Sequence, residues 1–184
     1  MKENGFDLSA DVVVQGWNRY FDRLLGPVFL ILVKEFWIHA TSSNHHVASY
    51  VMGKTIAITE DLIAKLIGYN GGGICCSDMD EKCFNLKAIS RVIFTSGKPS
   101  NKIRYLKDYF RIWEKIILGC INHRKLTSSL DYINIDQQFL LYFISKKTTI
   151  NLPHLLLNHL RTSGKETREE ERTKRDWIPL GRRF

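Results

Sequence analysis

Hydrophobic residues in the first forty positions recur at helical spacing. Within residues 6–40, aromatic and leucine side chains three or four residues apart define one face of an amphipathic helix: Trp17, Tyr20, Phe21, Leu24 and Leu25. Gly26 and Pro27 interrupt this pattern, because proline blocks a continuing helix but favours a new helix start. We expect a second helix over residues 27–40, apolar almost all round before Lys34 and therefore mostly buried.

A short β-hairpin and a clearly bounded helix are predicted next. Residues 49–58 alternate loosely between apolar and polar side chains around a turn at Gly53. Thr59 is suited to cap a helix, two acidic residues follow it at the positive end, and Gly68 is suited to end it. One stripe of this helix is apolar: Leu62, Ile63, Leu66 and Ile67. Residues 70–73 are expected to form a loop.

The second half of the chain predicts three further helices after a stretch, residues 74–100, without a clear pattern. Apolar residues keep a helical period from Ile103 to Cys120. Ser129 or Asp131 is expected to open the next helix, whose buried part includes Phe139, Leu140, Tyr142, Phe143 and Ile144. A last apolar helix starts at residues 151–153, with Pro153 in the first turn, and runs through Leu160.

Charged residues dominate the segment 161–184, with eight Lys and Arg against five Asp and Glu. Opposite charges four residues apart favour a solvated helix there: Lys165 and Glu169, Glu170 and Lys174, Glu171 and Arg175. The pattern as a whole predicts a mainly α fold. It consists of an irregular helical domain over residues 1–160 with one short β-hairpin, and a charged helical tail over residues 161–184.

Composition adds a basic net charge to this outline. The chain has 184 residues, a length typical of one domain, and 27 Lys and Arg against 19 Asp and Glu give a net charge of +8. This excess favours salt-sensitive, non-specific nucleic-acid binding. The basic residues look scattered rather than striped along the sequence, however, and the tail mixes its cations with glutamates. Weak nucleic-acid binding is therefore the alternative function.

The sequence lacks the usual signals for export or membrane insertion. Four cysteines are too few for a disulfide-built scaffold of this size. The polar N-terminus has no signal-peptide core, and the most apolar run, residues 24–33, is about half the roughly 20 residues that span a bilayer. We expect an intracellular protein, nuclear or cytoplasmic, with no membrane partner.

Candidate phosphate and metal motifs depart from the required geometry. Gly53-Lys54-Thr55 resembles the end of a phosphate-binding loop, but Ala48 replaces the first glycine and the following residues predict a strand. Four side chains could supply zinc ligands in number, but adjacent cysteines do not suit a structural zinc site: Cys75, Cys76, Cys83 and His123. The pairs His45 with His46 and His154 with His159 also lack the spacing for one metal. No cofactor or metal ligand is assigned.

Catalytic motifs are absent from the sequence as well. There is no G-x-S-x-G elbow, and a solvated acidic turn accounts for Asp78, Asp80 and Glu81. No catalytic residue is assigned, and the chain is not expected to be an enzyme.

Several segments, taken in order, resemble the plant transposon protein domain, which belongs to open reading frames of plant long-terminal-repeat retrotransposons, some labelled envelope-like. The resemblance covers about residues 20 to 184 and is carried by these segments: Leu32–Ala40, Val51–Ile58, Ile63–Gly68, Arg111–Leu118, Asp136–Ile144, Ile150–Pro153 and Ile178–Gly181. It implies a mobile-element origin in plants and supplies no catalytic residues. Family members continue into another apolar helix after the last segment, so we expect a truncated copy. The function expected is a non-catalytic structural or interaction module with unknown protein partners.

Overall fold

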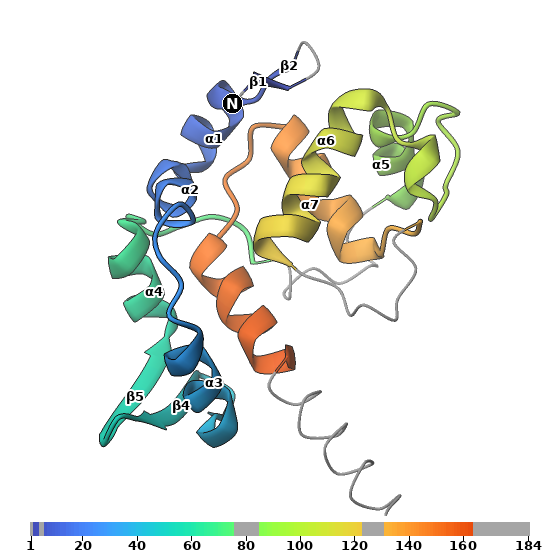
Figure 1. Ribbon diagram of the computed structural model, residues 1–184. Helices are drawn as coiled ribbons and strands as arrows, with labels where there is room; N and C mark the ends of the chain where they lie inside the picture. The colour runs from blue at the N-terminus through green and yellow to red at the C-terminus, as the bar shows by residue number, and fades with distance from the viewer. Residues whose placement is uncertain (1, 4–5, 76–84, 123–130, 164–184) are drawn as a thin grey trace, which may run out of the picture.

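The fold is mainly helical with a small antiparallel sheet. The computed structural model describes residues 2–3, 6–75, 85–122 and 131–163 (Figure 1). Its helices are α1 Ser9–Gln15, α2 Asn18–Arg23, α3 Leu30–His39, α4 Glu60–Ile67, α5 Leu86–Ile93, α6 Asp108–Ile116, α7 Ile135–Ser145 and an unlabelled helix over residues 152–163. The strands are β1 Lys2–Glu3, β2 Phe6–Asp7, β3 Thr41–Ser42, β4 His46–Val51 and β5 Lys54–Thr59.

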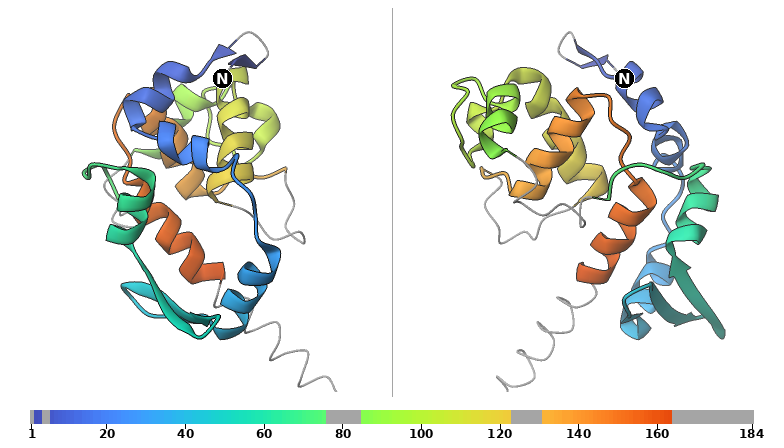
Figure 2. Two further views of the ribbon diagram at one scale, coloured as in Figure 1. Left: turned by 60° about the vertical axis from the view of Figure 1, so that its left-hand side comes forward. Right: turned by 180° about the vertical axis from the view of Figure 1, so that it is seen from behind.

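The β3–β4–β5 sheet and the group of helices formed by the second half of the chain lie at opposite ends of the molecule (Figure 1). Helices α5, α6 and α7 group with α1 at one end, and the sheet with α3 lies at the other (Figures 1 and 2). The helix of residues 152–163 runs from the helical group toward the sheet. The buried core nevertheless continues into this end, because it includes Ala40 and Val47, and Phe36, Trp37 and Ile58 pack against it.

Two tryptophans join the N-terminal helices to α6. Trp17, between α1 and α2, meets Trp113 of α6 edge to face, with ring centroids 6.2 Å apart and planes at 80°. Both side chains are buried, and such aromatic pairs add about 1 kcal/mol beyond the area they bury. Trp17 and Tyr20 therefore lie in the core as their helical spacing predicts. Leu24 and Leu25 do not, because α2 ends at Arg23 and leaves both side chains in solvent.

The predicted hairpin and the helix after it are confirmed. β4 and β5 pair antiparallel around a turn at Met52 and Gly53, both with positive φ. The Thr59 hydroxyl accepts a hydrogen bond from the Leu62 amide, and Gly68 ends α4 in the left-handed conformation. The sheet also has a third strand, β3, which pairs antiparallel with β4. The sequence pattern did not predict this strand.

Two predicted helix boundaries in the second half are wrong. The expected helix from Ile103 to Cys120 is divided into a 3-10 turn, Ile103–Tyr105, then α6, and a π-helical turn, Ile117–Ile121. Leu106 breaks it, because its extended backbone pairs with Phe94 in an isolated β-bridge.

The start of α7 also differs from the prediction. Helix α7 is capped by Asn134, whose side chain and that of Gln137 form a reciprocal capping box. The predicted openers do not start it, since Asp131 precedes the helix and Ser129 lies outside the described residues. Of the charged helical tail predicted over residues 161–184, residues 161–163 belong to the last described helix and the rest lies outside the described residues. The last described helix includes Pro153 in its first turn, as predicted.

Candidate functional site

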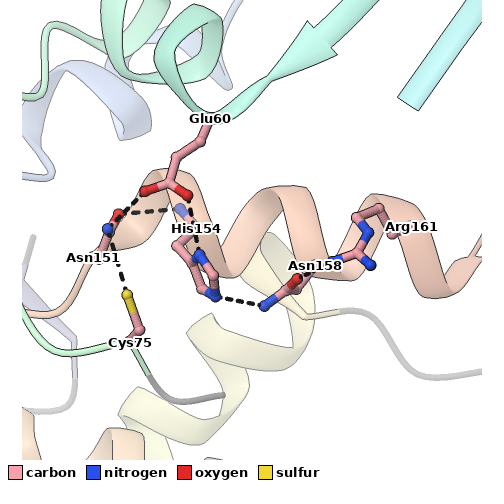
Figure 3. A network of polar contacts seen from close by, with 6 residues as sticks. All are labelled: Glu60, Cys75, Asn151, His154, Asn158 and Arg161. Carbon is pink, nitrogen blue, oxygen red and sulfur yellow. Dashed lines mark hydrogen bonds and ion pairs between the residues drawn. The ribbon is translucent and has the colours of Figure 1, made fainter. Parts of the chain in front are cut away.

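A chain of polar contacts connects the helix of residues 152–163 to the start of α4 (Figure 3). Nδ1 of His154 lies 3.0 Å from Oε2 of Glu60, and Nε2 of His154 lies 2.8 Å from the side-chain amide nitrogen of Asn158. Nη1 of Arg161 donates to the amide oxygen of Asn158 over 2.9 Å. Asn151 completes the cluster by donating to Oε1 of Glu60 over 2.8 Å.

The guanidinium of Arg161 determines the direction of every bond in this chain. Arginine is only a donor, so the group of Asn158 that faces it must be the oxygen. The amide nitrogen of Asn158 then faces His154 and donates to Nε2. An imidazole that accepts at Nε2 has its proton on Nδ1, from where it donates to Glu60. His154 is thus a neutral ring in this arrangement, with one defined tautomer.

This arrangement differs from that of a catalytic base. A histidine that activates a nucleophile is oriented through one ring nitrogen and keeps the other toward the reacting group. Both ring nitrogens of His154 are used by Glu60 and Asn158. The cluster instead positions one element against another.

The same helix contacts the sheet at its far end. Nε of Arg161 donates to the carbonyl of Ser43 over 2.7 Å, between β3 and β4. Because the Glu60 contacts lie near the first turn of this helix and the Ser43 contact near its last described turn, the helix is tied at both ends to the β3–α4 region.

A second polar cluster lies on α1. Asp11 is 3 % exposed and pairs with the ammonium of Lys147, and the Tyr109 hydroxyl donates to its other oxygen over 2.5 Å. Burial raises the pKa of Tyr109 well above its usual value, and the bond to Asp11 adds to the effect. The Asp11 carboxylate thus has a cation and a hydrogen-bond donor as partners. Like the first cluster, this one joins segments that are distant in sequence.

The residues singled out from the sequence do not form a metal site in the part of the chain that the structure describes. Within it, no three His, Cys, Asp or Glu side chains come together in a way that could hold a metal ion. Cys75 lies 3.7 Å from the side-chain nitrogen of Asn151. Its expected companions lie outside the described residues, as do the acidic residues considered with them: Cys76, Cys83, His123, Asp78, Asp80 and Glu81.

Gly53 lies in the turn of the hairpin, and Lys54 and Thr55 are the first residues of its second strand, β5, as expected for a strand rather than a phosphate loop. The glycine loop before Cys75 has a packing role. Gly73 has a φ of +103°, and a β-carbon there would lie 2.8 Å from the backbone of Ile150 and Asn151. This close approach lets Ile74 pair with Ile150 in a parallel bridge.

The largest departure from the sequence prediction concerns residues 27–40. They were expected to be mostly buried, yet none of the residues of α3 is buried, and only Ala40, just after it, is. The helix contacts β4, where Ser49 donates to the Phe36 carbonyl over 2.7 Å and the Met52 amide donates to Glu35 over 2.9 Å. One side of this largely apolar helix is covered in this way, and other apolar side chains of the helix are exposed.

We call this uncovered surface the α3 face; its members are apolar and more than half exposed: Leu25, Val28, Phe29, Leu30, Ile31 and Ile38. Ile31 and Ile38 are 80 % and 74 % exposed and lie seven residues apart, so they project from the same side of the helix. Clusters of exposed apolar side chains mark interaction sites in folded proteins. In the sequence, the signal for this surface was the apolar run from Val28 to Val33. Such a run does not show whether a helix lies in the core or at an interface.

Searches with protein-family models, curated proteins and solved structures find no match to this chain. None of the helices in the described ranges has the length and apolarity needed to cross a bilayer. The function of the chain is therefore inferred from its own residues.

Proposed function

We propose that the chain is a non-catalytic interaction module that binds a partner protein through the α3 face. We also propose a plant retrotransposon origin and a location inside the cell, nuclear or cytoplasmic, on the motifs described above. The single observation that carries the functional proposal is the exposure of the apolar side chains of α3 among the described residues.

The geometry of α3 suits recognition of another protein. Helices that dock into grooves present apolar anchors at positions i, i+3, i+4 and i+7. Ile31 and Ile38 have the i, i+7 relation, and Lys34 and Glu35 occupy the two positions between them. Burying a side chain of this size contributes roughly 1.5–3 kcal/mol. Contacts with β4 already order the helix, so binding a partner does not have to offset the conformational entropy lost when a helix folds.

The charges on α3 favour a protein over a lipid surface. Helices that lie in a membrane interface are rich in Lys and Arg on their polar side, which draws them to anionic lipids. Helix α3 has one Lys and one Glu, and Glu35 is bonded to the Met52 amide. A neutral, ordered apolar surface is typical of the centre of a protein interface.

A pull-down from plant extract with matched variants tests the proposal. Ile31→Ser with Ile38→Ser replaces the two most exposed apolar side chains of α3 and leaves its contacts with β4. The control is Val13→Ser with Val14→Ser on α1, which changes two exposed valines outside the α3 face. The wild type and the control are expected to retain the same partner, and the α3 variant to lose it.

Gel filtration and liposome sedimentation complete the test. A second copy as partner gives a dimer that the α3 variant lacks. A monomer that retains no protein contradicts the proposal, as does a partner retained equally by the α3 variant. If the wild type sediments with neutral liposomes and the α3 variant does not, the α3 face binds a membrane instead.

A further inference from the structure

The positive charge of the chain is concentrated in one segment. Residues 85–115 contain eight Lys and Arg against two acidic residues, a net +6. Seven of these eight cations are exposed, whereas Glu114 is buried and Asp108 is paired with Arg111. The basic residues are therefore not scattered, contrary to the expectation from the sequence.

The cations on the two helices of this segment form stripes. Lys87 and Arg91 lie four residues apart on α5. Lys107, Arg111 and Lys115 are spaced four apart along the exposed side of α6, beginning at its N-cap. Each step of four residues advances about 6 Å along a helix, close to the separation of neighbouring phosphates along an extended strand.

The stripes meet where α5 ends and α6 begins. The ammonium of Lys107 donates to the carbonyls of Arg91 and Val92 over 3.2 and 2.6 Å. The two rows are thus one continuous surface, which we call the basic face: Lys87, Arg91, Lys107, Arg111 and Lys115.

Two exposed tyrosines lie beside two further cations of the segment 85–115, Arg104 and Lys102. Tyr105 is 41 % exposed, and the guanidinium of Arg104 lies 4.8 Å from its ring centroid. The Tyr105 carbonyl accepts from the amide and hydroxyl of Thr95, just past the end of α5. This contact places the backbone of Tyr105 beside the segment that follows α5.

The second tyrosine lines a pocket. Tyr132 is 43 % exposed and pairs with Lys102 in a β-bridge. Both line a pocket of about 380 Å³ together with Ile103, Arg104 and Asp131. Proteins that bind single strands combine a basic track for the backbone with aromatic rings on which bases stack.

We propose that the basic face and the adjoining tyrosines bind single-stranded nucleic acid without sequence preference. The cations contact phosphates, and Tyr105 and Tyr132 stack on unpaired bases. A duplex keeps its bases stacked inside and gives these rings nothing to bind, so single strands are preferred. This binding uses a different surface from the α3 face and does not depend on the proposed protein partner.

Fluorescence anisotropy with the full chain tests the proposal, using labelled oligo-dT and oligo-U of about 20 nucleotides and a duplex of equal length. Lys87→Gln, Arg91→Gln and Lys115→Gln together remove three cations from the basic face and leave Lys107, which caps α5, in place. The matched control is Lys34→Gln, Lys54→Gln and Lys65→Gln, three exposed lysines outside the segment 85–115 with the same change of net charge.

The basic-face variant is expected to bind single strands at least tenfold more weakly at ~50 mM salt and to lower the salt slope by about 2, while the control stays within about twofold. Tyr105→Leu with Tyr132→Leu is expected to weaken single-strand binding about tenfold and leave duplex binding unchanged.

Three outcomes overturn the proposal. The first is that the wild type does not bind at ~50 mM salt. The second is that the basic-face variant and the control lose affinity equally, because binding then depends on net charge alone. The third is equal affinity for duplex and single strands. Circular dichroism of each variant shows whether it is folded, and the tyrosine variant gives an independent readout if a charge variant is not.

Discussion

Gln15 is a buried amide that connects α1 to the segment after α7, and its replacement provides a sharp test of the fold. Its Oε1 accepts from the amide of Ile150 over 2.9 Å, and its Nε2 donates to the carbonyl of Thr148 over 2.7 Å. Gln15 and Ile150 are almost fully buried. The substitution Gln15→Leu keeps most of the volume and removes both bonds.

The expected loss of stability follows from the two backbone groups left behind. A buried donor or acceptor without a partner costs about 1–3 kcal/mol. The Ile150 amide lies in a buried environment and takes the upper part of this range. The Thr148 carbonyl is half-buried and reaches water more easily, so it takes the lower part. Together they give a loss of about 3 kcal/mol, or a fall in Tm of roughly 6–12 °C for a chain of this size.

Urea unfolding followed by tryptophan fluorescence measures this loss. The control is Asn18→Leu, the same change of amide to isobutyl at the exposed first residue of α2, expected within about 0.5 kcal/mol of wild type. A Gln15→Leu chain as stable as the control refutes the assignment of Gln15 as a bridge between α1 and Ile150.

Three further predictions concern single positions. Gly73→Ala is expected to destabilise by about 3 kcal/mol or more in thermal unfolding, because its φ is positive and a β-carbon meets the Ile150 backbone, whereas Gly71→Ala, with open space around it, loses only about 1–2 kcal/mol. His154→Ala is expected to lower the free energy of unfolding in urea by about 1–2 kcal/mol, since its two side-chain bonds are lost; no change contradicts the polar chain of Figure 3. Burial, with a contribution from Cys120, raises the pKa of Tyr20 to about 12, so unfolded chains lose this proton first and stability falls as pH rises from about 10 to about 12. Tyr20→Phe should make that fall less steep in urea titrations across this range.

Local signals in the sequence predicted the elements whose boundaries are set by neighbouring residues. Helix α4 begins at a threonine cap and ends at Gly68, and the hairpin turns at Gly53, because capping and turn formation depend on contacts within a few residues. The break at Leu106 was missed because it comes from pairing with Phe94, twelve residues earlier.

The candidate sites depend on longer-range contacts, which periodicity does not contain. Glu60 looked like an ordinary first-turn acid, and its partner His154 is 94 residues away. The exposure of Ile31 was not predicted, because hydrophobicity shows only that a side chain avoids water. It does not show whether the chain's own core or a partner covers that side chain. The basic face was missed because Lys107 and Arg91 become neighbours only when α5 and α6 pack.

Photo-crosslinking from α3 tests the central claim most directly. A benzophenone amino acid replaces Ile31 in one chain and Val13 in another, both exposed apolar positions. Each chain is irradiated in plant extract, and crosslinked products are identified by mass spectrometry. A binding surface on α3 predicts one specific protein crosslinked from position 31 and not from position 13. No adduct at position 31, or the same adducts from both positions, contradicts it.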